Sequence, residues 1–118
     1  MKLFVDSNRK PENIYRSDKE WELVKTSFDL NKRINENLKI NNSFPDFISF
    51  DYSLDGKESG GLEALKDIIG IAVKLRLDMP KIYLHCNDRN LSIYFENALD
   101  VYTKKTDVSY YFEFIKRA

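Results

Sequence analysis

The chain has 118 residues, 42% of them hydrophobic and 14% aromatic, so it is long enough to bury one substantial core, and we predict a single domain over residues 1–118. Nineteen basic and nineteen acidic side chains cancel, which leaves no overall field to attract bulk double-stranded DNA or an anionic membrane. No apolar stretch approaches the ~20 residues of a membrane span, and no signal-peptide pattern follows Met1, so we expect a cytoplasmic protein.

The first part of the chain predicts two strands and a helix. Residues 2–5 form an apolar strand, and a polar loop follows it. Residues 17–20 match the capping box S-x-x-E, which would begin a helix there. Residues 21–26 instead alternate like a strand, with Thr26 or Ser27 placed to cap a later helix. We favour the strand followed by the helix.

The second part continues the alternation of strands and helices. Residues 47–50 are an apolar strand, and residues 62–76 carry a wide apolar stripe at helical spacing that ends before Pro80. Residues 81–86 predict a strand, and a helix follows from residue 91. The aromatic stretch 107–115 predicts a last strand, at a sheet edge or an interface.

This order of elements is an α/β pattern. Right-handed crossovers then give one receiver-like, flavodoxin-like domain with about five mostly parallel strands and helices on both faces. Three of the predicted strands end in residues that can carry chemistry, namely Asp6, Asp51 and His85. Ligands of open parallel sheets bind outside the carboxyl ends of the strands, so we expect a functional site where these three residues lie.

The motifs at these three strand ends resemble those of the cyclic-phosphate processing receiver family, a divergent branch of the receiver fold. The family opens on an apolar strand that ends in an acid pair with arginine and proline after it, which stands here as MKLFVDSNRKP in residues 1–11. Its central strand resembles S-L-D-H-D-L with a glycine soon after, and here SFDYSL (residues 49–54) precedes Gly60. Its later strand ends in histidine and serine with an asparagine nearby, where this chain has His85-Cys86-Asn87.

The chain departs from the family pattern at four positions. Ser7 replaces the second acid of the opening pair, Tyr52 and Ser53 replace the histidine and acid after Asp51, and Cys86 replaces the serine beside His85. The resemblance therefore implies a partly degraded site.

The groups that match still suit phosphate chemistry. His85 could be a general acid or base, and Arg9 could hold two phosphate oxygens through its planar guanidinium. The resemblance adds Asn87 as a second phosphate-binding residue. Asp6 and Asp51 could orient His85 or together hold Mg²⁺. We thus expect a protein that acts on or senses a cyclic or terminal phosphate of a nucleotide or RNA end. If it is an enzyme, we expect a phosphodiesterase or phosphohydrolase with Asp6, Asp51 and His85 as its catalytic residues.

A second hypothesis is that the chemistry is lost and that the protein binds a protein partner. Tyr110, Tyr111 and Phe112 would then supply the contact surface, since no basic residues are interleaved with them for stacking bases. The chain is rich in Asn, Lys, Ile and Tyr, as small proteins of AT-rich genomes are, including those of bacterial viruses, which would suit a host-interaction protein. Each site residue also has a structural explanation, such as a capping role for Asp51.

Overall fold

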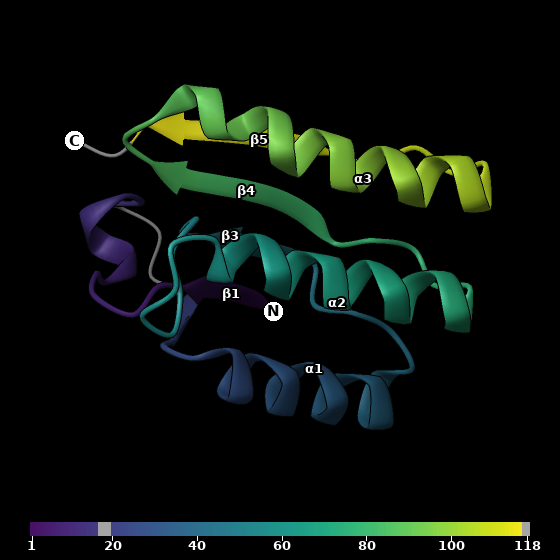
Figure 1. Cartoon of the computed structure of the whole chain (residues 1–118). Coiled ribbons are helices and arrows are strands. Elements are labelled where there is room, and N and C mark those ends of the chain that lie inside the picture. The colour runs from purple at the N-terminus through teal and green to yellow at the C-terminus, as the bar shows by residue number, and fades with distance from the viewer. Residues whose placement is uncertain (17–19, 117–118) are drawn as a thin grey trace.

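The computed structural model describes residues 1–16 and 20–116, which form one five-stranded parallel sheet with three α-helices (Figure 1). The residues of the alternative capping box, 17–20, lie mostly outside the described residues, whereas the favoured strand and helix are both confirmed. The elements are β1 (Lys2–Val5), η1 (Pro11–Asn13), β2 (Trp21–Val24), α1 (Ser27–Asn41), β3 (Phe47–Phe50), α2 (Gly60–Leu75), β4 (Lys81–Cys86), η2 (Arg89–Leu91), α3 (Ser92–Thr106) and β5 (Phe112–Lys116).

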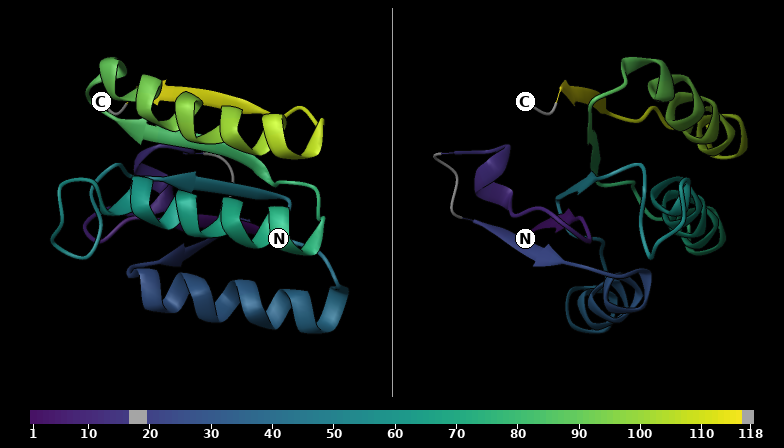
Figure 2. Two further views of the ribbon diagram at one scale, coloured as in Figure 1. Left: turned by 45° about the vertical axis from the view of Figure 1, so that its right-hand side comes forward. Right: turned by 60° about the vertical axis from the view of Figure 1, so that its left-hand side comes forward.

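The strands lie in the order β2-β1-β3-β4-β5, which is the order of flavodoxin-like folds, the class that the sequence predicts, although the order itself was not predicted. The expectation of helices on both faces is only partly correct, because all three α-helices lie on one face and the other face carries the 3₁₀ helix η1 (Figure 2). The handedness rule explains this difference. The crossovers β2→β3, β3→β4 and β4→β5 all run in one direction across the sheet, whereas β1→β2 runs in the other, so only that connection crosses the second face.

The helix ends follow local chemistry. The side chain of Thr26 accepts a hydrogen bond from the backbone N–H of Asp29 at 3.0 Å, so Thr26 is the N-cap of α1. The three helices end at Asn42, Arg76 and Asp107, each in the left-handed region, where the backbone N–H bonds back to the last turn. Pro80 follows the end of α2, as the sequence predicts.

The main core lies between the sheet and the helices. Alternate strand residues point toward the helices, and Phe50 packs its ring against Phe95 of α3 at 5.7 Å between centroids. The other face carries the remaining strand positions, which include rings and lysines. The fully buried residues of the helix-covered core include Leu3, Val5, Ile48, Phe50, Ile82 and Leu84 from the strands, and Leu30, Ile34, Leu65, Ile68, Phe95 and Leu99 from the helices.

The last strand is shorter than the predicted stretch 107–115, because β5 begins only at Phe112. Its three aromatic residues have different surroundings. Phe112 packs on Phe95, while Tyr110 donates a hydrogen bond to Asp100 at 2.8 Å. Tyr111 faces the side of the sheet away from the α-helices and is 46% exposed. The three rings therefore do not form one continuous surface.

Among the helices in the described part of the chain, none combines the length and the apolar run that crossing a bilayer requires.

Candidate functional site

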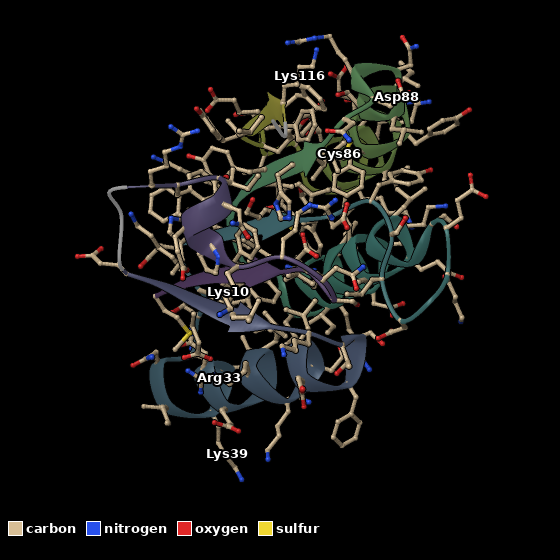
Figure 3. All side chains as sticks on the ribbon, turned by 90° about the vertical axis from the view of Figure 1, so that its left-hand side faces the viewer. Lys10, Arg33, Lys39, Cys86, Asp88 and Lys116 are labelled. Atoms are coloured by element: carbon tan, nitrogen blue, oxygen red, sulfur yellow. The ribbon has the colours of Figure 1, made fainter. Side chains whose placement is uncertain are left out.

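The candidate site lies at the carboxyl edge of the sheet, the end that faces the viewer in Figure 3. Val5, Phe50 and Leu84 are paired across β1, β3 and β4, so the next residues of these strands, Asp6, Asp51 and His85, stand at one level. Because side chains alternate along a strand, all three are directed to the face opposite the α-helices. The structure thus brings the three predicted catalytic residues to one place.

Asp6 is the anchor of this edge. It has no exposed surface, and its Oδ1 accepts hydrogen bonds from the backbone N–H groups of Asn8 and Arg9 at 2.8 and 3.0 Å. Its Oδ2 lies 3.0 Å from Nε2 of His85. One buried carboxylate therefore fixes the turn after β1 and connects it to β4.

His85 is also fully buried, and both of its ring nitrogens are occupied. Nδ1 lies 2.7 Å from Oγ of Ser49, and the imidazole stacks on Phe4 with 4.2 Å between centroids. The hydroxyl of Tyr15 lies 2.9 Å from the same Ser49 Oγ. These contacts form a hydrogen-bonded chain from Tyr15 through Ser49 and His85 to Asp6.

In this hydrogen-bonded chain, every donor has an acceptor when the imidazole is neutral with its proton on Nε2. Tyr15 then donates to Ser49, Ser49 donates to Nδ1 of His85, and Nε2–H donates to the Asp6 carboxylate. Burial raises the pKa of the Asp6 carboxyl, but the hydrogen bonds from His85 and from two backbone N–H groups outweigh burial, so the pKa is lowered overall. Asp6 is therefore a carboxylate at neutral pH.

Ser49 and Tyr15 were not among the predicted site residues. Ser49 is the single polar residue of an otherwise apolar strand, which is a usable signal, because buried polar groups need partners. Tyr15 has no comparable signal, since it reaches the site from the β1–β2 connection.

Asp51 is 6% exposed, and its backbone N–H donates to the Val5 carbonyl at 2.9 Å. Two glycines hold α2 against the segment that follows Asp51. A Cβ on Gly61 would lie 1.8 Å from the Asp51 carbonyl oxygen, and a Cβ on Gly60 would lie 2.1 Å from that of Leu54. The glycine after the central strand is thus required by close backbone approach.

The two predicted phosphate-binding residues lie at the rim of this edge. Arg9 is half-buried, and its backbone is held by Asp6, but its guanidinium has no hydrogen bond or ion pair among residues 1–16 and 20–116. Asn87 directly follows β4 and is exposed. Lys116 is opposite Cys86 in the register of β4 and β5, and Figure 3 shows both at this end of the sheet. Cys86 itself is buried.

The hydrogen bonds of Asp6 can be compared with what the expected magnesium site of Asp6 and Asp51 would require. Mg²⁺ requires carboxylate oxygens with open positions, whereas Asp6 accepts three hydrogen bonds and is buried. Within the described ranges, no three His, Cys, Asp or Glu side chains are close enough to form a metal cluster. The magnesium site stays a prediction, and the hydrogen bonds of Asp6 argue for a structural use of that carboxylate.

The site contains the polar groups of an Asp–His–Ser triad, but none of the three is exposed. In this arrangement the imidazole of His85 holds Asp6 and Ser49 and has no exposed surface. At the rim, Arg9 is half-buried and Asn87 is exposed, so both side chains have surface that solvent reaches.

A five-stranded parallel sheet in this order, with acids at the carboxyl ends of β1 and β3, defines a receiver-like α/β domain. The chain belongs to the family of cyclic-phosphate processing receiver domains, whose sequence model matches residues 1–100. The matched region contains β1 to β4 and most of α3, and hence every site residue described above except Lys116. No curated protein matches the chain.

Proposed function

We propose that this domain recognises a cyclic or terminal phosphate of a nucleotide or of an RNA end at the carboxyl edge of its sheet. The observation that carries the proposal is the Asp6 turn, in which one buried carboxylate holds the backbone of Asn8 and Arg9. This turn fixes the base of the Arg9 side chain beside the end of β1. Family membership supports the same class of ligand.

The chemistry of recognition rests on Arg9. A guanidinium binds two phosphate oxygens at once through parallel N–H groups, and Arg9 has no carboxylate partner in the described part of the chain to compete for it. The exposed amide of Asn87 would donate a further hydrogen bond from the end of β4. Lys116 would add positive charge from the end of β5.

The same geometry supports recognition over hydrolysis. A general acid or base must come within hydrogen-bond reach of the proton that it moves. His85 has 0% exposure, and Asp6 and Ser49 occupy both of its nitrogens. Its role in this proposal is to hold Asp6, and thereby the Arg9 turn.

Phosphorus NMR tests the proposal directly. The purified protein is titrated with 2′,3′-cyclic nucleotides and a short RNA ending in a 2′,3′-cyclic phosphate, with and without Mg²⁺. We expect the phosphorus line of the cyclic phosphate to shift or broaden without conversion, and we expect Arg9→Ala to remove the effect on that line because the bidentate contact is lost. Lys39→Ala is the control, since Lys39 lies on α1 away from the edge (Figure 3).

Two outcomes would redirect this proposal. If the parent protein converts the substrate and Ser49→Ala does not, the protein is a hydrolase and the buried hydrogen-bonded chain takes part in hydrolysis. Unchanged spectra with folded protein would contradict phosphate recognition and favour protein-partner binding, for which β5 offers an edge strand.

A further inference from the structure

A row of aromatic rings and lysines crosses the face of the sheet that no α-helix covers. The strand register places Lys2 opposite both Trp21 and Phe47, and Phe47 opposite Lys81. Tyr111 stands next to Lys81, because its carbonyl accepts the backbone N–H of Ile82. Across β2, β1, β3, β4 and the residue before β5, the ring–lysine row is therefore Trp21, Lys2, Phe47, Lys81 and Tyr111.

Each lysine of the row lies between two rings. Nζ of Lys2 is 5.6 Å from the centroid of Trp21 and 5.1 Å from that of Phe47. Nζ of Lys81 is 5.3 Å from the centroid of Phe47 and 5.5 Å from that of Tyr111. The row thus alternates ring and ammonium over the whole width of the sheet.

The face also has further rings beside the row. Tyr83 lies 6.1 Å from Phe47 and 5.8 Å from Tyr111, and Tyr15 stacks on Trp21 at 4.4 Å. Tyr111 and Lys81 are exposed, and Trp21, Phe47 and Tyr83 are partly exposed. Of the described residues outside the strands, those of the β1–β2 connection, with η1, lie on this side, as the right-hand view of Figure 2 shows.

We infer that this face binds single-stranded nucleic acid, with bases stacked on the rings and phosphates contacted by Lys2 and Lys81. Base stacking on aromatic rings combined with lysine contacts to the backbone is the general chemistry of single-strand binding. Duplexes do not offer their base faces, so the proposal does not extend to them. Lys81 is exposed, and an exposed cation–π contact is weaker than base stacking, so its ammonium can move from its rings to a phosphate, whereas the half-buried Lys2 would meet a phosphate from its present position.

The composition of the row favours nucleic acid over a protein partner. Lysine is depleted in protein–protein interfaces, yet here it takes every second position of the row. Among the described residues, the acids near the row that form ion pairs or hydrogen bonds lie at its margins. Glu20 is 3.8 Å from Lys2 with its side chain 79% exposed, Asp46 pairs with the terminal amine, and Glu113 accepts from the Tyr111 hydroxyl. Exposed pairs of this kind are weak, so phosphate can displace Glu20.

This surface is separate from the proposed phosphate site. The row lies at the first residues of the strands, and the Arg9 edge lies beyond their last residues. An oligonucleotide with hydroxyl groups at both ends therefore tests the row alone.

The experiment uses Trp21, the single tryptophan of the chain, as the reporter. A single-stranded homopyrimidine oligonucleotide with two hydroxyl ends is titrated into the full chain, and Trp21 emission and the salt dependence of binding are measured. We expect quenching by the single strand and much weaker quenching by the matching duplex. We expect Tyr111→Ala to weaken binding at least about fivefold. Lys81→Gln should reduce the slope of log affinity against log salt by about 0.7.

The matched controls are Tyr94→Ala and Lys39→Gln, which remove an exposed ring and a lysine from helices on the opposite face. Both should bind like the parent. The inference is overturned if folded parent protein gives no quenching, if duplex binds equally well, or if the controls lose as much affinity as the row variants. Because Arg9→Ala leaves this binding unchanged under our inference, its result separates the row from the phosphate site.

Discussion

At the scale of single residues, Asp6 connects the turn after β1 to His85 and so holds the candidate site together. It is fully buried, and its stability as an anion depends on three donors from two different parts of the chain. Burying a charge is costly unless it is paired and hydrogen-bonded. The contact with His85 therefore stabilises the folded state as well as shaping the site.

We predict that Asp6→Asn lowers the free energy of unfolding by about 3 kcal/mol at neutral pH, because one buried partner of a charged hydrogen-bonded group is lost. The folded-state pKa of Asp6 lies below its ordinary value of 3.8, so its contribution is complete above that value. The contribution is lost as the pH falls through the lowered pKa. Urea unfolding of both proteins at several pH values measures the difference.

The control for this prediction is Asp67→Asn, which changes an exposed carboxylate on α2. It should leave stability within about 0.5 kcal/mol of the parent. If the Asp6 and Asp67 variants are equally stable at neutral pH, the anchoring role of Asp6 is wrong.

The sequence predicts which residues end the strands, but not how their side chains pair. Asp6 and His85 were expected together because parallel strands end at one edge. Ser49 was not expected, because it is 36 positions away from His85 and its role depends on the register of β3 and β4. The burial of His85 was also not predictable, since it follows from the Phe4 ring and the Tyr15 segment that enclose it.

At the scale of elements, the start of α2 is fixed by backbone contact. Gly60 and Gly61 bring the helix against the carbonyls of Leu54 and Asp51, where no side chain fits. Gly70, farther along the same helix, has open space around its Cβ position. The two kinds of glycine therefore predict opposite effects of the same substitution.

We predict that Gly61→Ala destabilises the fold by more than about 3 kcal/mol, because its Cβ would overlap the Asp51 carbonyl and force α2 away. Gly70→Ala serves as the matched control and should stabilise the protein by about 0.5–1 kcal/mol through helix propensity. Thermal unfolding of both variants measures these effects. Equal melting temperatures would contradict the close-approach argument.

Most elements could be predicted because each strand or helix has its own local pattern. The apolar stripe of α2 and the alternation of β2 both matched the structure, and Thr26 caps α1 as proposed. The placement of the helices was only partly predicted. It depends on the direction of each crossover in the sheet, and strand order is not visible in a local pattern.

At the scale of the whole molecule, the sheet has a protected centre and two open edges. The strands β1, β3 and β4 each have a neighbour on both sides, whereas β2 and β5 have one. We predict that hydrogen exchange is slowest in β1, β3 and β4 and faster in β2 and β5, because edge strands open by local fluctuation. Exchange monitored by NMR checks this order. Equal protection in all five strands would indicate that the edges are covered in solution.

The ring–lysine row also belongs to this scale. The sequence shows Tyr110, Tyr111 and Phe112 without interleaved basic residues, which argued against base stacking. The lysines come from β1 and β4, at positions 2 and 81, and only the folded sheet places them between the rings. The row runs across the strands, so its residues are far apart in the sequence and form no local pattern there.

The contact between Asp6 and His85 joins positions that are 79 residues apart, and this distance matters during synthesis. A ribosome adds about 5–20 residues per second, so roughly 4–16 s separate the appearance of the two residues. During that interval β1 can be made, but its terminal carboxylate has no imidazole to meet. A nascent chain that assembled β1 and β3 early would bury the Asp6 anion without its imidazole partner, so we expect the sheet to close only after β4 has been synthesised.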